Sequence, residues 1–233
     1  MVGTRPTDYD AVVFDNDGVI VEPSETVDIA DAVCQAFRDV GHEPDRSSVE
    51  RAVSAGAGPR ETVETARVNG HRADGELDVD LDAFWRRREA RAAERQKRLI
   101  ENGGKELYDD VAVLGSLEAR LGMVSNNQAE TVAFIVDHYG LDFFEAVYGR
   151  EPTVTGAERK KPDPYYLDRA LSELGTRDAL YVGDSEVDVR AARRACVDSA
   201  FLRREHSADT DLAVEPTYDV PDLRALAEVV ART

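Results

Sequence analysis

The chain of 233 residues has few cysteines and few lysines, and it lacks any long apolar run. Its two cysteines, Cys34 and Cys196, have no metal-ligating neighbours in sequence, which favours buried free thiols over a disulfide or metal framework. No segment approaches the roughly 20 consecutive apolar residues that a membrane helix needs. The first ten residues lack the basic and apolar pattern of a secretory signal. These absences predict a cytoplasmic protein without a membrane segment.

Basic residues are also scarce relative to acidic ones. The sequence has 29 lysines and arginines against 47 aspartates and glutamates, a formal net charge of −18, and only four of the basic residues are lysines. A chain this acidic repels nucleic acids and anionic membranes. The composition is similar to that of halophilic proteins, in which salt screens the repulsion between surface charges. We therefore expect a small-molecule partner and no nucleic acid or membrane partner, and both a monomer and a homodimer stay open.

The order of apolar patterns predicts an α/β fold with a helical insert. Residues 11–14 read as a buried strand, whereas the apolar spacing from about residue 24 to 102 is helical throughout, with no strand. After the insert, helices and short apolar strands alternate, which is typical of a doubly wound, Rossmann-like parallel sheet. Helices are expected at residues 25–40, 48–55, 60–68, 81–101, 109–120, 130–139, 164–174, 187–195 and from 221. Strands are expected at residues 11–14, 122–124, 146–148, 180–182 and 200–202.

Acidic side chains follow two of the predicted strands. Asp15 and Asp17 come directly after the first strand, and Asp184 and Asp188 come after the strand at residues 180–182. Because ligands bind at the carboxyl ends of parallel strands, these carboxylates should converge, and they would repel one another without a cation. Ligand sets made only of oxygen suit Mg²⁺. One such pair of aspartates is more often a turn or a helix cap, but two pairs at strand ends favour a metal site for phosphoryl chemistry.

Two further segments carry side chains suited to binding phosphate. Ser125 ends a predicted strand with Asn126 behind it, and its hydroxyl can donate to a phosphoryl oxygen near a helix N-terminus, although the segment alone equally fits the start of a helix. Lys161 precedes Pro162, which favours an extended backbone and can direct the ammonium group across the site. A solvated surface pair of lysines is the alternative, and a shift of one residue would exchange Lys160 for Lys161.

Taken in order, these motifs resemble those of the haloacid dehalogenase-like superfamily, and the resemblance covers nearly the whole chain. The motifs are residues 14–19 (FDNDGV), 124–126 (VSN), 161–162 (KP) and 183–188 (GDSEVD). The resemblance implies that Asp15 is the nucleophile and that Asp17 protonates the leaving oxygen and later activates water. It also implies that Ser125 binds the phosphoryl group and that Lys161 neutralises its charge.

The same resemblance implies a metal site and a cap. Mg²⁺ would be held by Asp15, the backbone carbonyl of Asp17 and Asp184, with Asp188 supporting the metal shell. The insert resembles the helical cap of this superfamily, which excludes water and selects the leaving group. Arg60 in the insert is a candidate for gripping an anionic substrate, and an ordinary surface arginine is the alternative. We expect a core of residues 1–21 and 103–233 and a cap of residues 22–102.

The sequence therefore predicts a Mg²⁺-dependent phosphatase of the phosphoglycolate phosphatase-like branch that acts on a small phosphorylated metabolite. The branch that hydrolyses carbon–halogen bonds lacks the second aspartate of the first motif, and Asp17 is present here. A phosphosugar mutase of the same superfamily is the alternative among enzymes. A non-catalytic binding protein on the same scaffold is the alternative outside enzymes.

Overall fold

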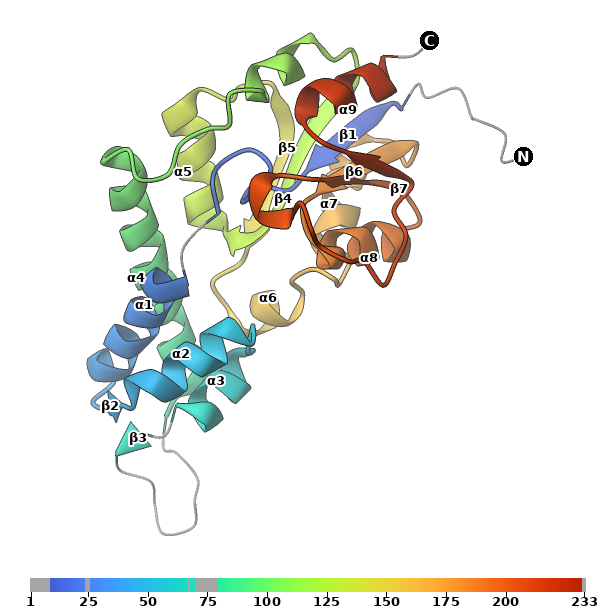
Figure 1. The fold of residues 1–233 in the computed structure, drawn as a ribbon. Coiled ribbons are helices and arrows are strands. Elements are labelled where there is room, and N and C mark those ends of the chain that lie inside the picture. The colour runs from blue at the N-terminus through green and yellow to red at the C-terminus, as the bar shows by residue number, and fades with distance from the viewer. Residues whose placement is uncertain (1–8, 24–25, 67, 70–78, 232–233) are drawn as a thin grey trace.

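The computed structural model describes residues 9–23, 26–66, 68–69 and 79–231. Parts of the predicted core (1–8 and 232–233) and of the predicted cap (24–25, 67 and 70–78) lie outside the described residues. The α/β part contains both ends of the described chain, and the helical insert packs below it (Figure 1). No helix within the described segments is long and apolar enough to cross a membrane.

Six parallel strands form the central sheet, in the order β5-β4-β1-β6-β7-β8. The strands are β1 (Ala11–Phe14), β4 (Arg120–Gln128), β5 (Phe144–Arg150), β6 (Ala179–Gly183), β7 (Asp198–Leu202) and β8 (Tyr218–Val220). Every residue of β1 is inaccessible to solvent, because the strand lies in the middle of the sheet and is covered on both faces. The predicted doubly wound α/β class is confirmed.

Alternation along β1 divides the core into two apolar layers. Val12 and Phe14 point to the face covered by α5 (Ala129–Tyr139) and α9 (Leu223–Val230). Ala11 and Val13 point to the opposite face, where α7 (Tyr165–Leu174) and α8 (Glu186–Ala195) pack. Figure 1 shows these helix pairs on the two sides of the sheet. Both layers pack against the sheet, so they fix the positions of its strands and of the loops that follow them.

The helical insert has an apolar cluster of its own. The helices of the insert are α1 (Thr26–Asp39), α2 (Arg46–Ser54), α3 (Pro59–Thr65) and α4 (Leu81–Glu101). The rings of Phe37 on α1 and Phe84 on α4 pack with centroids 4.3 Å apart. The prediction that this segment contains no strand is wrong, because β2 (Glu43–Pro44) pairs antiparallel with β3 (Val68–Asn69). Strands of two residues are too short to show an alternating pattern in sequence.

Several elements of the core also differ from the sequence-based expectation. The helix expected at residues 109–120 is a short 3₁₀ helix, η1 (Val111–Ser116), whose buried Val111 and Leu114 are three residues apart, the repeat of a 3₁₀ turn. The sequence patterns missed the edge strand β8 and the five-residue helix α6 (Val154–Glu158), since each is too short for a periodic pattern.

The two cysteines lie in different environments. Cys34 on α1 is buried, as expected, whereas Cys196 is exposed, so the prediction of a buried thiol is wrong there. Cys196 caps the C-terminus of α8 in the left-handed region, with φ of +58°. The helix ends one residue before it, and the turn faces the thiol outward.

The chain passes between the core and the insert through two adjacent segments, which we call the paired linkers (residues 20–22 and 106–108). Val21 forms an antiparallel bridge with Leu107. The Glu22 amide donates to the Glu106 carbonyl at 3.0 Å, and the Tyr108 amide donates to the Ile20 carbonyl at 3.1 Å. These backbone hydrogen bonds hold the outgoing and returning chains together.

A buried ion pair between Asp110 and Arg204 connects the start of η1 to the segment after β7. Its loss should lower the stability of the fold. Both guanidinium nitrogens Nη1 and Nη2 of Arg204 donate to Asp110 at 2.8 Å, and the Leu223 amide donates to the same carboxylate at 2.8 Å. Asp110→Asn leaves Arg204 partly unpaired in a dry environment, so we expect a loss of about 3 kcal/mol in the free energy of unfolding. Thermal unfolding should then occur about 6–12 °C lower.

The pH dependence of stability provides a second measurement on the same pair. Although burial opposes the charge, the hydrogen bonds from Arg204 and the Leu223 amide lower the pKa of Asp110. The stabilisation is therefore complete above the ordinary carboxyl pKa and is lost as the pH falls through the lowered value. Asp168→Asn, which removes an exposed pair with Arg177, is the control and should change the unfolding temperature little. Equal stability of the Asp110 variant and the parent would contradict the assignment.

Candidate active site

The loop after β1 carries the first two acidic side chains. The Asp15 amide donates to the Val182 carbonyl at 2.8 Å, which fixes Asp15 against β6. The following turn is closed by the Asn16 carbonyl, which accepts hydrogen bonds from the amides of residues 19–21. Gly18 has φ of +79°, and a Cβ atom there would collide with the carboxylate of Asp184. Glycine is therefore required both by the turn and by the acidic residue that approaches it.

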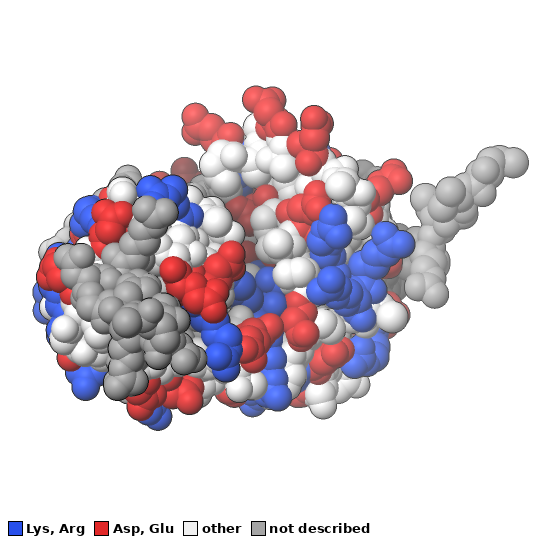
Figure 2. All heavy atoms as spheres, turned by 90° about the horizontal axis from the view of Figure 1, so that it is seen from below, with Lys and Arg blue, Asp and Glu red and all other residues white. Residues whose placement is uncertain are grey.

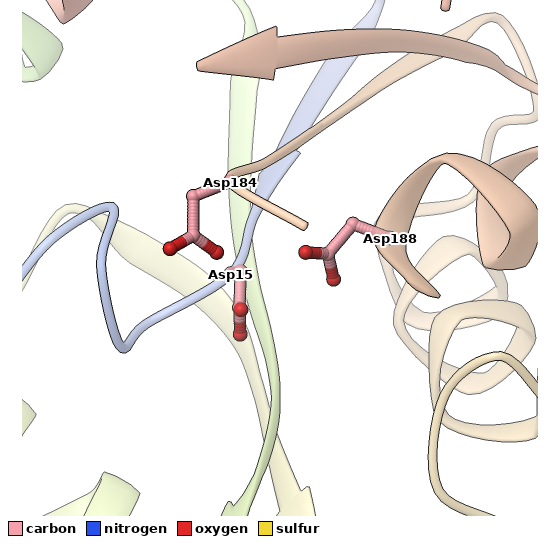
Figure 3. Close-up of side chains that lie close together, drawn as sticks. All are labelled: Asp15, Asp184 and Asp188. Carbon is pink, nitrogen blue, oxygen red and sulfur yellow. The ribbon is translucent and has the colours of Figure 1, made fainter. Parts of the chain in front are cut away.

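The loop after β6 brings two more carboxylates to the same place. Asp184 follows β6 directly, and Asp188 lies in the first turn of α8, where the Ser185 amide donates to it at 3.1 Å. A Cβ atom on Gly183 would collide with the carboxylate of Asp188, so the strand has to end in glycine. Figure 3 shows Asp15, Asp184 and Asp188 with their carboxylates directed toward one another.

These three carboxylates fit a divalent cation. One oxygen from each of Asp15, Asp184 and Asp188 lies within 4.8 Å of the other two. Burial raises the pKa of Asp15, and Asp188 and Asp184 raise it further against the opposing effect of Lys161. Burial and Asp188 likewise raise the pKa of Asp184. Crowded, buried carboxylates of this kind are stabilised by a hard cation such as Mg²⁺. The side chain of Asp17 is not part of this cluster, and its predicted ligand atom is the backbone carbonyl.

Lys161, rather than Lys160, lies against the acidic cluster. Its ammonium group is 2.7 Å from Asp15 and 2.7 Å from Asp188, and it is almost fully buried. Burial alone would lower the pKa of Lys161, but the two carboxylates raise it well above the ordinary value, so the side chain stays charged. Asn126 accepts from the Lys161 amide at 2.7 Å and donates to its carbonyl at 3.1 Å, which positions the lysine backbone.

The other predicted residues lie outside the cluster of three carboxylates. Ser125 is buried in the second half of β4, accepts from the Asn127 amide at 3.0 Å and lies 3.5 Å from a carboxylate oxygen of Asp17. Lys160 donates to the Gly56 carbonyl of the insert at 2.8 Å. Arg60 is exposed on the first turn of α3 and does not line the pocket described below. The structure therefore brings together the predicted core residues but not Arg60.

Asp17 has a partner that the sequence patterns did not reveal. It forms an ion pair with Lys105, which is completely buried, and it accepts hydrogen bonds from Asn127 at 3.0 Å and Asn16 at 3.2 Å. Burial opposes the charge on Asp17, but Lys105 and these amides lower its pKa below the ordinary value. Lys105 directly precedes residues 106–108 of the paired linkers. The scarcity of lysine in the chain is the one sequence signal that could have marked it.

His206 is the second residue that sequence reasoning missed. It lies in the short 3₁₀ helix η2 (Glu205–Ser207) after β7, and its Nε2 is 2.6 Å from Asp184. This contact lowers the pKa of Asp184 against the effects of burial and Asp188. A lone histidine in a three-residue 3₁₀ helix carries no motif that would mark it in sequence.

A pocket of about 360 Å³ opens in front of Asp15 between the core and the insert. Its lining includes Asp15, Asp17 and Ser125 as well as apolar side chains of α1 and α2 such as Val33 and Val53. A volume of this size accommodates a small metabolite. The structure therefore brings three carboxylates and the buried ammonium group of Lys161 together, and Asp15 of this group opens into the pocket beside Asp17.

This arrangement agrees with comparisons to known proteins. The sequence model of the haloacid dehalogenase-like hydrolases matches residues 9–195. The chain belongs to this family, and it is a hydrolase. It is 30% identical over 213 residues to the phosphoglycolate phosphatase of Colwellia psychrerythraea, covering 87% of this chain and 88% of that one. It is 29% identical over 215 residues to the phosphoglycolate phosphatase of Cereibacter sphaeroides, covering 90% and 89% of the two chains.

Solved structures show the same fold. CbbY from Rhodobacter sphaeroides, in complex with phosphate, superimposes with a TM-score of 0.65 at 18% identity, covering 95% of this chain and 96% of that one. A predicted phosphoglycolate phosphatase from Haemophilus somnus superimposes with a TM-score of 0.63 at 22% identity, covering 96% and 98% of the two chains. At these identities the likeness extends to the fold alone.

Proposed function

We propose that the protein hydrolyses a small phosphate monoester through a phosphoryl group carried on Asp15. An oxygen of Asp15 attacks phosphorus while the bond from phosphorus to the alcohol oxygen breaks, and Asp17 gives that oxygen a proton. Water then attacks the phosphorus of phospho-Asp15, Asp17 takes up its proton, and inorganic phosphate leaves. The observation that carries this proposal is the close group of Asp15, Asp184, Asp188 and Lys161, of which Asp15 lines the pocket.

Each neighbouring group has a role in this scheme. Lys161 and Ser125 would bind the oxygens of the phosphoryl group, with Asn126 holding Lys161 in place. The ion pair with Lys105 stabilises the charged carboxylate of Asp17, and this is the form that takes a proton from water in the second step. To donate a proton in the first step, Asp17 has to be protonated and its ion pair with Lys105 has to break. Asp15, Asp184 and the Asp17 carbonyl would hold Mg²⁺, with Asp188 supporting it. Bound there, Mg²⁺ would neutralise charge that develops on the phosphoryl oxygens.

The helical insert and the acidic composition also bear on the function. Residues 22–102 would act as a cap that closes the pocket and selects the leaving group. Because the curated relatives are phosphoglycolate phosphatases, 2-phosphoglycolate is the first substrate to assay. We also infer a halophilic setting from the net charge of −18, so assays belong at both low and molar KCl, and a cytoplasmic location stays a prediction.

The role of Asp17 predicts a dependence on the leaving group. Asp17→Asn should slow alcohol release from an alkyl phosphate about 10³-fold, because an alkoxide leaves poorly without a proton. Release of p-nitrophenol from its phosphate ester should fall less than about tenfold, since that anion needs little protonation. Single-turnover measurements isolate this first step from the later hydrolysis of the phosphoryl enzyme.

Two outcomes would contradict this assignment. Equal losses on both esters would mean that Asp17 serves the metal site rather than the leaving oxygen. Conversion of a sugar phosphate into its isomer without release of phosphate would establish the mutase alternative instead.

A further inference from the structure

Three cationic side chains line the same pocket as Asp15 and lie outside the cluster of carboxylates. Arg88 comes from α4 of the insert, Arg150 from the end of β5, and Lys160 from the loop before α7. Arg88 is 8% exposed and Arg150 is 6% exposed. Figure 2 shows basic side chains in the hollow between the helical insert and the α/β part of the molecule. In a chain with so many acidic residues, two buried arginines beside a half-buried lysine are unexpected.

Among the described residues, Glu89 is the carboxylate that bonds the two arginines, and Glu61 is a second carboxylate whose charge acts on Lys160. Glu89 accepts from Nη2 of Arg150 at 3.0 and 2.7 Å and from Nη1 of Arg88 at 2.5 Å. Lys160 donates to a backbone carbonyl instead, that of Gly56. Burial lowers the pKa of Lys160, and the charges of Arg150 and Arg88 lower it further. The cluster therefore has more positive than negative charge.

Several donors of the cluster are unused. The Nε–H groups of Arg88 and Arg150 and the indole N–H of Trp85 are buried without a hydrogen-bond partner in the described part of the chain. Trp85 also packs against the guanidinium of Arg88, 4.9 Å from the ring centroid. Buried donors without acceptors are costly, and guanidinium groups match carboxylate and phosphate oxygens in geometry. An anionic ligand supplies the missing acceptors.

We propose that Arg88, Arg150 and Lys160 bind a second anionic group of the substrate, a carboxylate or a phosphate. This inference rests on the proposed function, in which Ser125 and Lys161 hold the phosphoryl end of the same molecule. The preferred substrates are then short phosphate esters whose leaving alcohol carries a negative charge. The site differs from the sequence-based candidate Arg60, which lies outside the pocket lining.

Kinetics with two matched esters test the proposal. 2-Phosphoglycolate carries a carboxylate where 2-hydroxyethyl phosphate carries a neutral alcohol. Arg88→Met should raise KM for 2-phosphoglycolate about 30-fold and change KM for 2-hydroxyethyl phosphate less than about twofold. Glu89 keeps its two bonds to Arg150 in this variant, so the cluster stays folded. Arg86→Met, an exposed change on the same helix, is the control and should leave both constants unchanged.

Trp85 provides a readout that needs no turnover. It is the sole tryptophan of the chain, so its fluorescence reports on this end of the pocket. In Asp15→Asn with Mg²⁺, 2-phosphoglycolate should change the fluorescence at a concentration at least about tenfold lower than 2-hydroxyethyl phosphate. Adding Arg88→Met should abolish that difference. A pentulose 1,5-bisphosphate compared with the 5-phosphate shows whether the second group is phosphate rather than carboxylate.

The outcomes separate this inference from the proposed function. Hydrolysis with the same KM for charged and neutral esters, or a selective effect of Arg60→Met in place of Arg88→Met, would overturn the second anion site and leave the phosphatase intact. No turnover of either ester or of p-nitrophenyl phosphate would overturn the proposed function. The fluorescence titration would still decide whether the site prefers a second anion.

Discussion

Asp15→Asn should abolish turnover, with kcat reduced by at least about 10⁴-fold. The amide is a poor nucleophile, and it removes one of the three carboxylates that would hold the metal. Acid quenching of the parent during turnover should leave a phosphoryl group on Asp15, which mass spectrometry of the peptide can detect. The variant should show no phosphopeptide.

The fold of this variant should remain intact, since the amide fills nearly the same space. Circular dichroism and the unfolding temperature provide the check. Asp142→Asn, a change at an exposed aspartate, is the matched control and should retain parental activity. Activity of Asp15→Asn near the parental level would reject the covalent mechanism.

Removal of divalent metal should have an effect of similar size. A chelator should reduce activity at least about 100-fold, and excess Mg²⁺ should restore it. Ca²⁺ should restore little, because its larger and looser coordination shell places the oxygens of Asp15 and Asp184 differently. Full activity in the presence of the chelator would contradict the proposed metal site.

Metal binding also has a signature that is independent of activity. Mg²⁺ that binds the folded protein should raise the unfolding temperature, and more so at higher concentration. Asp184→Asn should require a higher Mg²⁺ concentration for the same rise, whereas Asp142→Asn should respond as the parent does. An identical Mg²⁺ response in the Asp184 variant would remove this residue from the ligand set.

The strand-end motifs could be predicted because the residues that matter are close in sequence to the strands that position them. Asp15 follows a wholly apolar strand, and Asp184 and Asp188 are spaced by one helical turn, so a parallel sheet is enough to bring them together. The choice between Lys160 and Lys161 needed the structure, because adjacent residues differ only in the direction of the side chain. Lys161 points to Asp15, and Lys160 points to the insert.

The residues that the sequence did not reveal act across long distances in the chain. Lys105 reaches Asp17, and Glu89 on the insert pairs with Arg150 on the core. Neither contact leaves a local pattern, since each depends on how the insert packs against the sheet. For the same reason, the sequence offered Arg60 as the cation of the insert, whereas the structure places Arg88 in the pocket lining.

The paired linkers have a consequence for how such an enzyme can diversify. Since the outgoing chain at Val21 and the returning chain at Leu107 lie side by side, the segment between them starts and finishes at one point of the core. Exchange of that segment leaves the order of the six strands unaltered. One continuous stretch of gene can thus be replaced or recombined, so that descendants acquire a different wall for the pocket while inheriting the same acidic cluster.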